Sequence, residues 1–158
     1  MGSLFSLKEA NKLLARFLLV AQHTGPYLSI EPLGQKFGET QIGFVVDGAA
    51  LKQRARNNLP YINGSQVIEK WGSFENMLVE GKVEAIIRST SEVPKLYTVE
   101  MLTARAATSL GIPVFVVEDF PGNYRSSPQE LLAGLFVEDD SMVEIHGSRG
   151  VDQNKIFT

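Results

Sequence analysis

The sequence has 158 residues, of which 44% are hydrophobic and 21% charged, and its net charge is −3. A chain of this length and composition is expected to form one globular domain that needs neither a disulfide nor a metal to fold. The negative net charge offers no basic surface for nucleic acid or for anionic lipid. The absence of cysteine excludes disulfides, thiolate catalysis and zinc–thiolate sites.

The location of the protein is suggested by what the sequence lacks. The longest apolar run, Phe17 to Ala21, is far shorter than the about 20 residues that a membrane-spanning helix needs. The first residues show no charged-then-apolar signal peptide with a cleavage site. We therefore expect a cytoplasmic protein with no membrane span and no nucleic-acid partner.

The first half of the sequence alternates short apolar strands with helical periodicity. Phe17 to Ala21 is continuously apolar, which is typical of a parallel strand covered on both faces. Apolar side chains then recur at helical spacing up to Gly38, where a helix would end. The strands expected in this half are residues 17–21, 41–46, 59–62 and 84–88, and the helices are residues 27–37, residues 49–57 and one capped by Ser65.

The helix expected after Ser65 carries a buried apolar stripe at helical spacing. The stripe consists of Val67, Trp71, Phe74 and Leu78. Gly72 lies inside it and weakens the prediction of one unbroken helix.

The second half begins with a helix that Thr98 caps and Gly111 ends. Residues 112–117 form the clearest strand, because they are almost entirely apolar and rich in valine. Ser127 to Glu130 is a capping box with proline at the first helical position, which predicts a short helix up to Ala133. The remaining predictions are a strand at residues 134–137, a second capping box at Ser141 to Glu144 whose helix ends near His146, and a last strand that begins at Lys155.

About six alternations of strand and helix predict a parallel sheet with right-handed crossovers and helices on both faces. The expected fold class is α/β: a Rossmann-like three-layer α/β/α sandwich with a mostly parallel sheet of six or seven strands. Residues 1–158 are expected to form this single domain. Because the last strand begins just before Thr158, we expect the domain to be the N-terminal half of a two-domain protein.

The loops at the carboxyl ends of the strands are the candidate site, because ligands of open parallel sheets bind there. The first such loop is Gln22-His23-Thr24-Gly25-Pro26, where the N-terminus of the next helix attracts anions. His23 is predicted to act as a general base or to contact a phosphate, and the alternative is a turn histidine with an ordinary hydrogen bond. Gln22, Thr24 and Gly25 are predicted to bind ligand.

Two later loops add hydroxyl and carboxyl groups. Ser89 and Thr90 can bind phosphate or sugar hydroxyls, and the alternative is that they cap a turn. Glu118 and Asp119 can serve as acid and base, although neighbouring side chains of an extended strand point to opposite faces. Glu118 is predicted to be catalytic, and Asp119 and Asn123 to bind ligand. The alternative is that either carboxylate anchors the loop through hydrogen bonds.

Other polar residues carry weaker signals. The acidic residues 138–140 precede a helix and are expected to cap it. His146 closes that helix and receives no catalytic role. No metal site is expected with two histidines and no cysteine, and no cofactor is expected because the glycine fingerprint of nicotinamide and flavin enzymes is missing. A receiver-type phosphorylation domain is excluded, because no acidic pair follows the first strand.

Three stretches resemble the N-terminal domain of the GT-B glycosyltransferase and UDP-N-acetylglucosamine 2-epimerase superfamily. Arg16 to Pro26 resembles the first strand and loop of that domain. Ala106 to Asp119 resembles its late helix and strand, and Gly134 to Asp139 with Asp152 to Thr158 resembles the segment that leads to the second domain. The glycine-rich histidine loop of many such enzymes is shortened here.

The resemblance implies an acceptor-side domain that is inactive alone, because most contacts to the nucleotide sugar lie in the second domain of these enzymes. The implied partners are a nucleotide sugar, an acceptor and the protein's own C-terminal domain, and the implied chemistry is glycosyl transfer or nucleotide-sugar epimerisation. The residues that would face the cleft are His23, Thr24, Gly25, Ser89, Thr90, Glu118 and Asp119. The alternative function is a non-catalytic Rossmann-like module that binds a small ligand or another protein.

Overall fold

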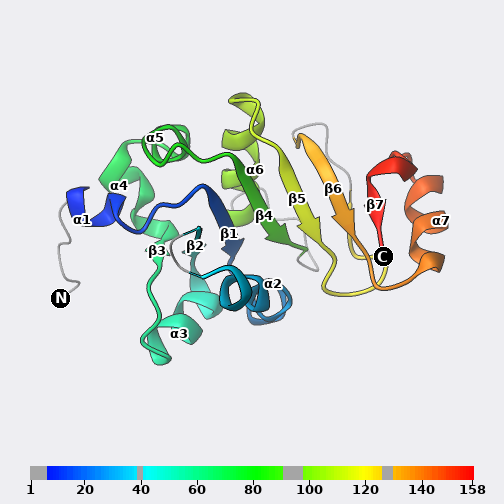
Figure 1. Cartoon of the computed structure of the whole chain (residues 1–158), viewed down its shortest axis with the longest axis horizontal. Helices are drawn as coiled ribbons and strands as arrows, with labels where there is room; N and C mark the ends of the chain where they lie inside the picture. Colours follow the sequence, from blue (N-terminus) through cyan, green and yellow to red (C-terminus); the bar gives the residue numbers. More distant parts are fainter. Residues whose placement is uncertain (1–6, 39–40, 91–97, 126–129) are drawn as a thin grey trace.

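A computed structural model describes residues 7–38, 41–90, 98–125 and 130–158 of the chain. The strands are β1 (Phe17–Ala21), β2 (Ile42–Val46), β3 (Ile62–Asn63), β4 (Ala85–Ser89), β5 (Val114–Val117), β6 (Leu132–Phe136) and β7 (Ile156–Phe157). These described strands form one seven-stranded sheet in the order β3-β2-β1-β4-β5-β6-β7, and all their pairings are parallel (Figure 1). The prediction of a Rossmann-like α/β fold is confirmed.

Helices cover both faces of the sheet. They are α1 (Leu7–Asn11), α2 (Thr24–Phe37), α3 (Gly48–Arg56), α4 (Val67–Trp71), α5 (Phe74–Glu80), α6 (Val99–Ser109) and α7 (Asp140–Ser148), with short 3₁₀ turns at Gly64–Gln66 and Gln153–Lys155. Helices α2 and α3 pack on one face, and α1 and α4 to α7 contribute to the core on the other. Figure 1 shows α2 in front of the sheet and α6 behind it.

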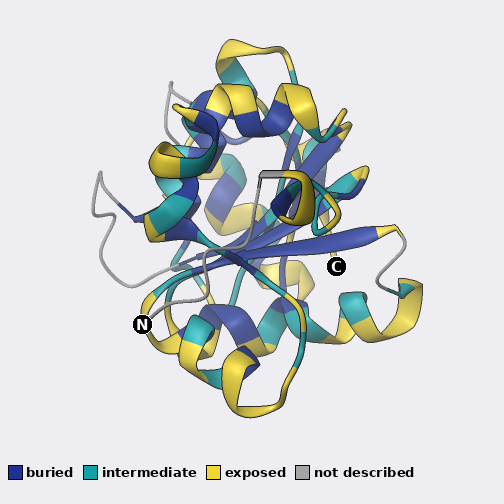
Figure 2. Ribbon diagram, turned by 90° about the vertical axis from the view of Figure 1, so that its left-hand side faces the viewer, coloured by how far each residue is buried: buried dark blue, intermediate teal, exposed yellow. Residues whose placement is uncertain are grey.

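The central strand β1 explains why its sequence is apolar at every position. Leu18 and Val20 enter the core on the side of α6, whereas Leu19 and Ala21 enter the core on the side of α2. All four side chains are fully buried, and Figure 2 shows the strands as the buried centre of the molecule. A strand between two helical layers has no solvent face, so the polar–apolar alternation of a half-exposed strand is lost.

The helix predicted after Ser65 is two helices. Gly72 adopts a φ of 81°, a left-handed conformation that ends α4, and Ser73 caps α5 by accepting a hydrogen bond from the Asn76 amide. The expected cap at Ser65 is wrong, because the Asn63 side chain accepts from the Ser65 amide and begins a 3₁₀ turn.

The prediction of a short helix at residues 127–133 is wrong for residues 130–133, the part of this segment that the structure describes. Residues 126–129 lie outside the described residues, Glu130 and Leu131 are irregular, and Leu132 already belongs to β6. Glu130 is drawn into the core by Arg88, whose Nε and Nη2 donate to the two carboxylate oxygens at 2.5 and 2.8 Å. The carbonyl of Leu131 accepts from the Val114 amide at 2.9 Å, so the backbone joins the sheet instead of coiling.

Smaller differences concern where elements begin. Helix α2 begins at Thr24, one turn before the expected Tyr27, and β3 is shorter than the expected strand at residues 59–62. The cap of α7 is Asp139, which accepts from the amides of Ser141 and Met142, so the second capping box does not form as predicted. The expectation that the acidic run before α7 caps it is correct.

Replacing Glu130 with alanine is expected to lower the free energy of unfolding by about 3–5 kcal/mol, because Arg88 would keep its charge in the core without a partner. Both side chains of this pair are nearly inaccessible to water. Chemical denaturation in urea measures the loss. The matched control is Glu84→Ala, which breaks the exposed Arg16–Glu84 pair and should cost much less, since water screens those charges. Equal losses in the two variants would contradict the account.

Candidate functional site

The carboxyl ends of β1, β4 and β5 meet at one edge of the sheet. Strand β1 pairs with β4, and β4 pairs with β5, so the loops that follow the three strands are neighbours. The chain leaves β1 through α2 on one face and leaves β4 toward α6 on the other. Such a reversal of direction opens the crevice in which parallel sheets bind ligands.

The loop after β1 ends at His23, which is the N-cap residue of α2. His23 is exposed, and its side chain makes no capping hydrogen bond. Helices α3, α6 and α7, in contrast, are capped by Asp47, Thr98 and Asp139. The first amides of α2 therefore lack a capping side chain, and with the helix dipole they suit an anionic group of a ligand.

A polar cluster lies beside this helix end. Thr90 donates from Oγ1 to Asp119 Oδ1 at 2.5 Å and accepts from the Asp119 amide, while Asn123 Nδ2 donates to the same Oδ1 at 3.2 Å. The second oxygen, Oδ2, faces Gly25 of α2, where an added Cβ would lie 3.3 Å from it. The structure thus brings Gly25, Thr90, Asp119 and Asn123 together, and Asp119 Oδ2 is placed to accept a hydrogen bond from a ligand hydroxyl.

Gln22 connects the first loop to α6. Its backbone amide donates to Glu100 Oε1 at 2.8 Å, and its side-chain oxygen accepts from the Val99 amide at 3.0 Å. The side-chain oxygen of Gln22 therefore fixes the loop after β1 against the N-terminus of α6. The role in ligand binding predicted for Gln22 stays a prediction.

Glu100 is a feature of the edge that the sequence analysis missed. It is 2% exposed, and its Oε2 has no hydrogen-bond partner among the described residues. Burial raises the pKa of Glu100, against the opposing effect of the hydrogen bonds from its own amide and from Gln22. A protonated Glu100 would offer an O–H donor between the first loop and α6. In the sequence it looks like an ordinary acid in the first turn of a helix.

Ser89 lies below the surface of this edge. It is fully buried, and its Oγ lies 2.7 Å from Ser29 Oγ and donates to the Val117 carbonyl at 2.9 Å. Thr90 is 2% exposed and is occupied by Asp119. Both hydroxyls stabilise the ends of β4 and β5, and their predicted contacts with ligand stay predictions.

Glu118 points away from Asp119, toward α7, as expected for neighbours on an extended strand. Its carboxylate is 1% exposed and accepts from three described groups: the Gly122 amide at 2.9 Å, the Tyr124 amide at 2.8 Å and His146 Nε2 at 2.7 Å. This is the anchoring role that the sequence left open. The predicted catalytic role stays a prediction, and the geometry favours positioning.

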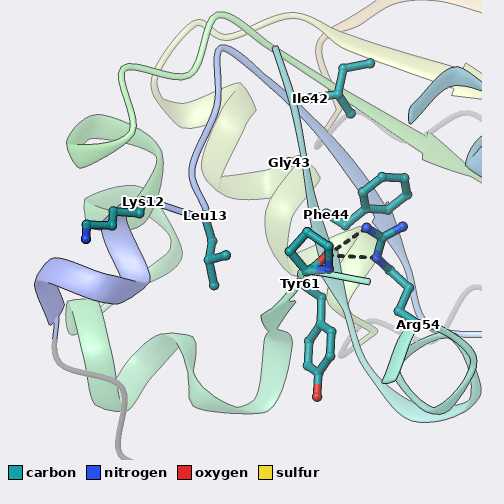
Figure 3. A pocket seen from close by; sticks show the side chains of 8 residues that line it. Lys12, Leu13, Ile42, Gly43, Phe44, Arg54 and Tyr61 are labelled. Atoms are coloured by element: carbon teal, nitrogen blue, oxygen red, sulfur yellow. Dashed lines mark hydrogen bonds between the residues drawn. The ribbon is translucent and has the colours of Figure 1, made fainter. Parts of the chain in front are cut away.

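Two cavities lined by described residues lie elsewhere. One cavity, of about 160 Å³, lies beside β2, where Arg54 Cζ lies 3.6 Å from the centroid of the Phe44 ring. Figure 3 shows the two side chains together. Arg54 donates from Nε and Nη2 to the Pro60 carbonyl, so these two donor groups are already engaged within the protein. A second, of about 540 Å³, runs beside α2 and is lined by apolar residues such as Phe37 and Phe115, with no ionisable side chain among its described lining residues.

Glu100→Gln is expected to flatten the pH dependence of stability. Because the folded pKa of Glu100 is raised, its stabilising contribution is present at acid pH and is lost as pH rises through that pKa. Glutamine keeps an oxygen for the Gln22 amide and carries no charge. The variant should therefore gain melting temperature relative to the parent at about pH 8 and gain less at about pH 4. If the melting temperatures of the variant and the parent changed in parallel with pH, the raised pKa assigned to Glu100 would be contradicted.

Glu118→Ala is expected to release the loop after β5. The amides of Gly122 and Tyr124 lose a charged acceptor, which is worth about 1.5–3 kcal/mol for such a bond, so their hydrogen exchange should accelerate by at least about tenfold. Amide exchange followed by NMR measures this. The control is Glu138→Ala, which removes the same charge from an exposed position. Unchanged exchange at Gly122 and Tyr124 would show that the carboxylate does not hold the loop.

No protein-family model and no curated protein sequence matches this chain. Among solved structures, UDP-N-acetylglucosamine 2-epimerase from Rickettsia bellii is similar over 91% of this chain and 44% of its own, with a TM-score of 0.63 and 16% identity. MurG from Acinetobacter baumannii, a GT-B glycosyltransferase, is similar over 81% of this chain and 42% of its own, with a TM-score of 0.57 and 16% identity.

Within the described part of the chain, no helix has the length and apolar character required to cross a bilayer. The expected likeness to the GT-B and epimerase superfamily is confirmed at the level of the fold. The fold of this chain is similar to part of each of the two structures, and the chain spans less than half of the length of each.

Proposed function

We propose that this chain is the acceptor-side N-terminal domain of a glycosyltransferase-like or nucleotide-sugar epimerase-like protein and is inactive alone. The observation that carries the proposal is the juxtaposition of the α2 N-terminus with Asp119 at the edge formed by β1, β4 and β5. The fold likeness to two enzymes of this kind, of which the chain covers 42% and 44%, supports it. The proposed partner is a C-terminal domain of the same protein, and the proposed location is the cytoplasm.

The chemistry available at this edge suits a sugar-containing ligand. The uncapped amides of α2 can bind an anionic group, and Asp119 Oδ2 can accept a hydrogen bond from a hydroxyl. His23 is exposed beside them, and an imidazole can exchange a proton with a bound hydroxyl. Glu118 has a positioning role in this proposal, because its carboxylate is occupied and buried.

The division between two domains can be tested with the gene and the protein together. We expect the reading frame to continue beyond Thr158 into a second α/β domain, and the full-length product to bind UDP or a UDP-sugar in calorimetric titration. The chain of residues 1–158 is expected to release no UDP from a UDP-sugar. A stop codon after Thr158, or a full-length protein that binds neither UDP nor UDP-sugars, would favour the non-catalytic module.

The roles at the edge can be tested by substitution in the full-length protein. His23→Ala is expected to lower kcat/KM by about a hundredfold, within the usual range for a lost proton-transfer group. Asp119→Asn is expected to lower it by about tenfold or more, because the ligand hydroxyl loses a charged hydrogen-bond acceptor. Steady-state kinetics with the UDP-sugar that binds best provides the measurement. Glu75→Gln is the control, because it removes one charge from an exposed position on α5, which packs on the opposite face. Losses no larger than that of the control would exclude these roles.

A further inference from the structure

We propose that this domain binds an uncharged, largely hydrocarbon small molecule in a groove between α2 and the strands β4, β5 and β6. The groove is the apolar cavity of about 540 Å³ beside α2. Its wall on α2 includes Leu33 and Phe37, and its floor includes Ile87, Phe115 and Phe136. The groove lies on the α2 face of the sheet and not at the carboxyl edge of the strands, so the inference does not rest on the proposed function.

A row of three phenylalanines continues the floor of the groove toward the end of the sheet at β7. The ring centroids of Phe115 and Phe136 are 6.4 Å apart, and those of Phe136 and Phe157 are 5.4 Å apart. Gly134 makes room for this row, because a Cβ there would lie 3.0 Å from the Phe115 ring and 3.2 Å from the Phe157 ring. Phe136 and Phe157 are nevertheless half-exposed. The row is therefore a packed apolar surface that is open to water.

The order of the strands explains why this surface is uncovered. Strands β4, β5, β6 and β7 follow one another in chain order across the sheet, and right-handed crossovers place the connections of such a series on one face. Helices α6 and α7 and Tyr124, which follows β5, join the core on the face opposite α2. The described helices on the α2 face are α2 and α3, which pack over β1 and β2. Parallel sheets are ordinarily covered on both faces, so the described part of the chain leaves a place beside α2 for another molecule.

The side chains that line the groove select the chemistry of that molecule. None of the described lining residues is ionisable, and the polar ones among them are Ser29 and Gln41. Ser29 Oγ donates to the Pro26 carbonyl and lies 2.7 Å from Ser89 Oγ, so it is engaged within the protein. A charged ligand would lose its hydration here without gaining a partner, whereas an apolar ligand is stabilised by leaving water.

The extent of the exposed apolar surface favours a small molecule over a second copy of the chain. Phe37, Phe136 and Phe157 are 50%, 42% and 45% exposed. Half of the roughly 150–250 Å² that an aromatic side chain can bury is about 100 Å², or roughly 300 Å² for the three rings together. A stable dimer buries about 800 Å² on each partner. The volume of the groove, in contrast, falls within the roughly 300–1,000 Å³ of small-molecule sites.

The test is a methyl-selective NMR titration of the whole chain with decanol, with ethanol as the reference for solvent effects. We expect saturable shifts of the methyl signals of Leu33, Ile87 and Val117, which line the groove. The methyl signals of Leu78 and Val83, in the core on the other face, should stay unchanged. The absence of saturable shifts at the groove residues would overturn the proposal.

Two substitutions at the groove should each weaken decanol binding by at least about tenfold, because each places a carboxylate in an apolar lining. They are Phe136→Glu on β6 and Phe37→Glu on α2, and both positions are half-exposed, so the fold should tolerate either change. The matched control is Ile68→Glu, at a 58% exposed position of α4 on the other face, which should bind decanol as the parent does. Unchanged affinity in a folded groove variant would overturn the proposal.

The same spectra identify other occupants of the groove. Groove methyl signals that shift with protein concentration before decanol is added would identify a second copy of the chain. Decanol binding by residues 1–158 that is lost in the full-length protein would show that a further domain covers the groove. Either result would overturn the proposal, and neither bears on the binding of a UDP-sugar at the carboxyl edge of the sheet.

Discussion

The buried carboxylate of Glu118 is the interaction on which the loop after β5 and its contact with α7 depend. It follows β5 directly and accepts hydrogen bonds from the Gly122 amide, the Tyr124 amide and His146. These bonds fix the path of the chain between β5 and β6. Because Glu118 points toward α7, Asp119 must point toward α2, where it meets Thr90 and faces Gly25. One residue therefore sets the position of the acidic group at the sheet edge and of His146 on α7.

The sheet itself could be predicted from the sequence because its signals are local. Continuous apolar runs such as Phe17 to Ala21 arise when a strand is covered on both faces, and this condition holds for β1 in the structure. The break at Gly72 and the cap at Thr98 are also local, since a positive φ favours glycine and a threonine hydroxyl can bond the amide three residues later. The general location of the site follows from the parallel sheet alone.

The parts that the sequence did not reveal depend on residues far apart in the chain. Glu130 stands in a local helix signal, but it pairs with Arg88, which lies 42 residues earlier, and the backbone after it joins β6. Glu100 resembles a first-turn acid until the fold buries it beside Gln22. His146 looks like a helix-end cation until α7 packs against Tyr124 and Glu118. In each case burial next to a distant partner changes what the side chain can do. The spacing of residues along the chain does not indicate which distant residue that partner is.

The central claim is that the carboxyl edge of β1, β4 and β5 is the side of the sheet that meets the sugar ligand. Hydrogen–deuterium exchange of the full-length protein, with and without a saturating UDP-sugar and acceptor, tests this most directly. The account predicts that ligand slows exchange in residues 22–30 and 118–124, which follow β1 and β5. Protection confined to the opposite edge, in residues 12–16 and 110–113 that precede these strands, would contradict it.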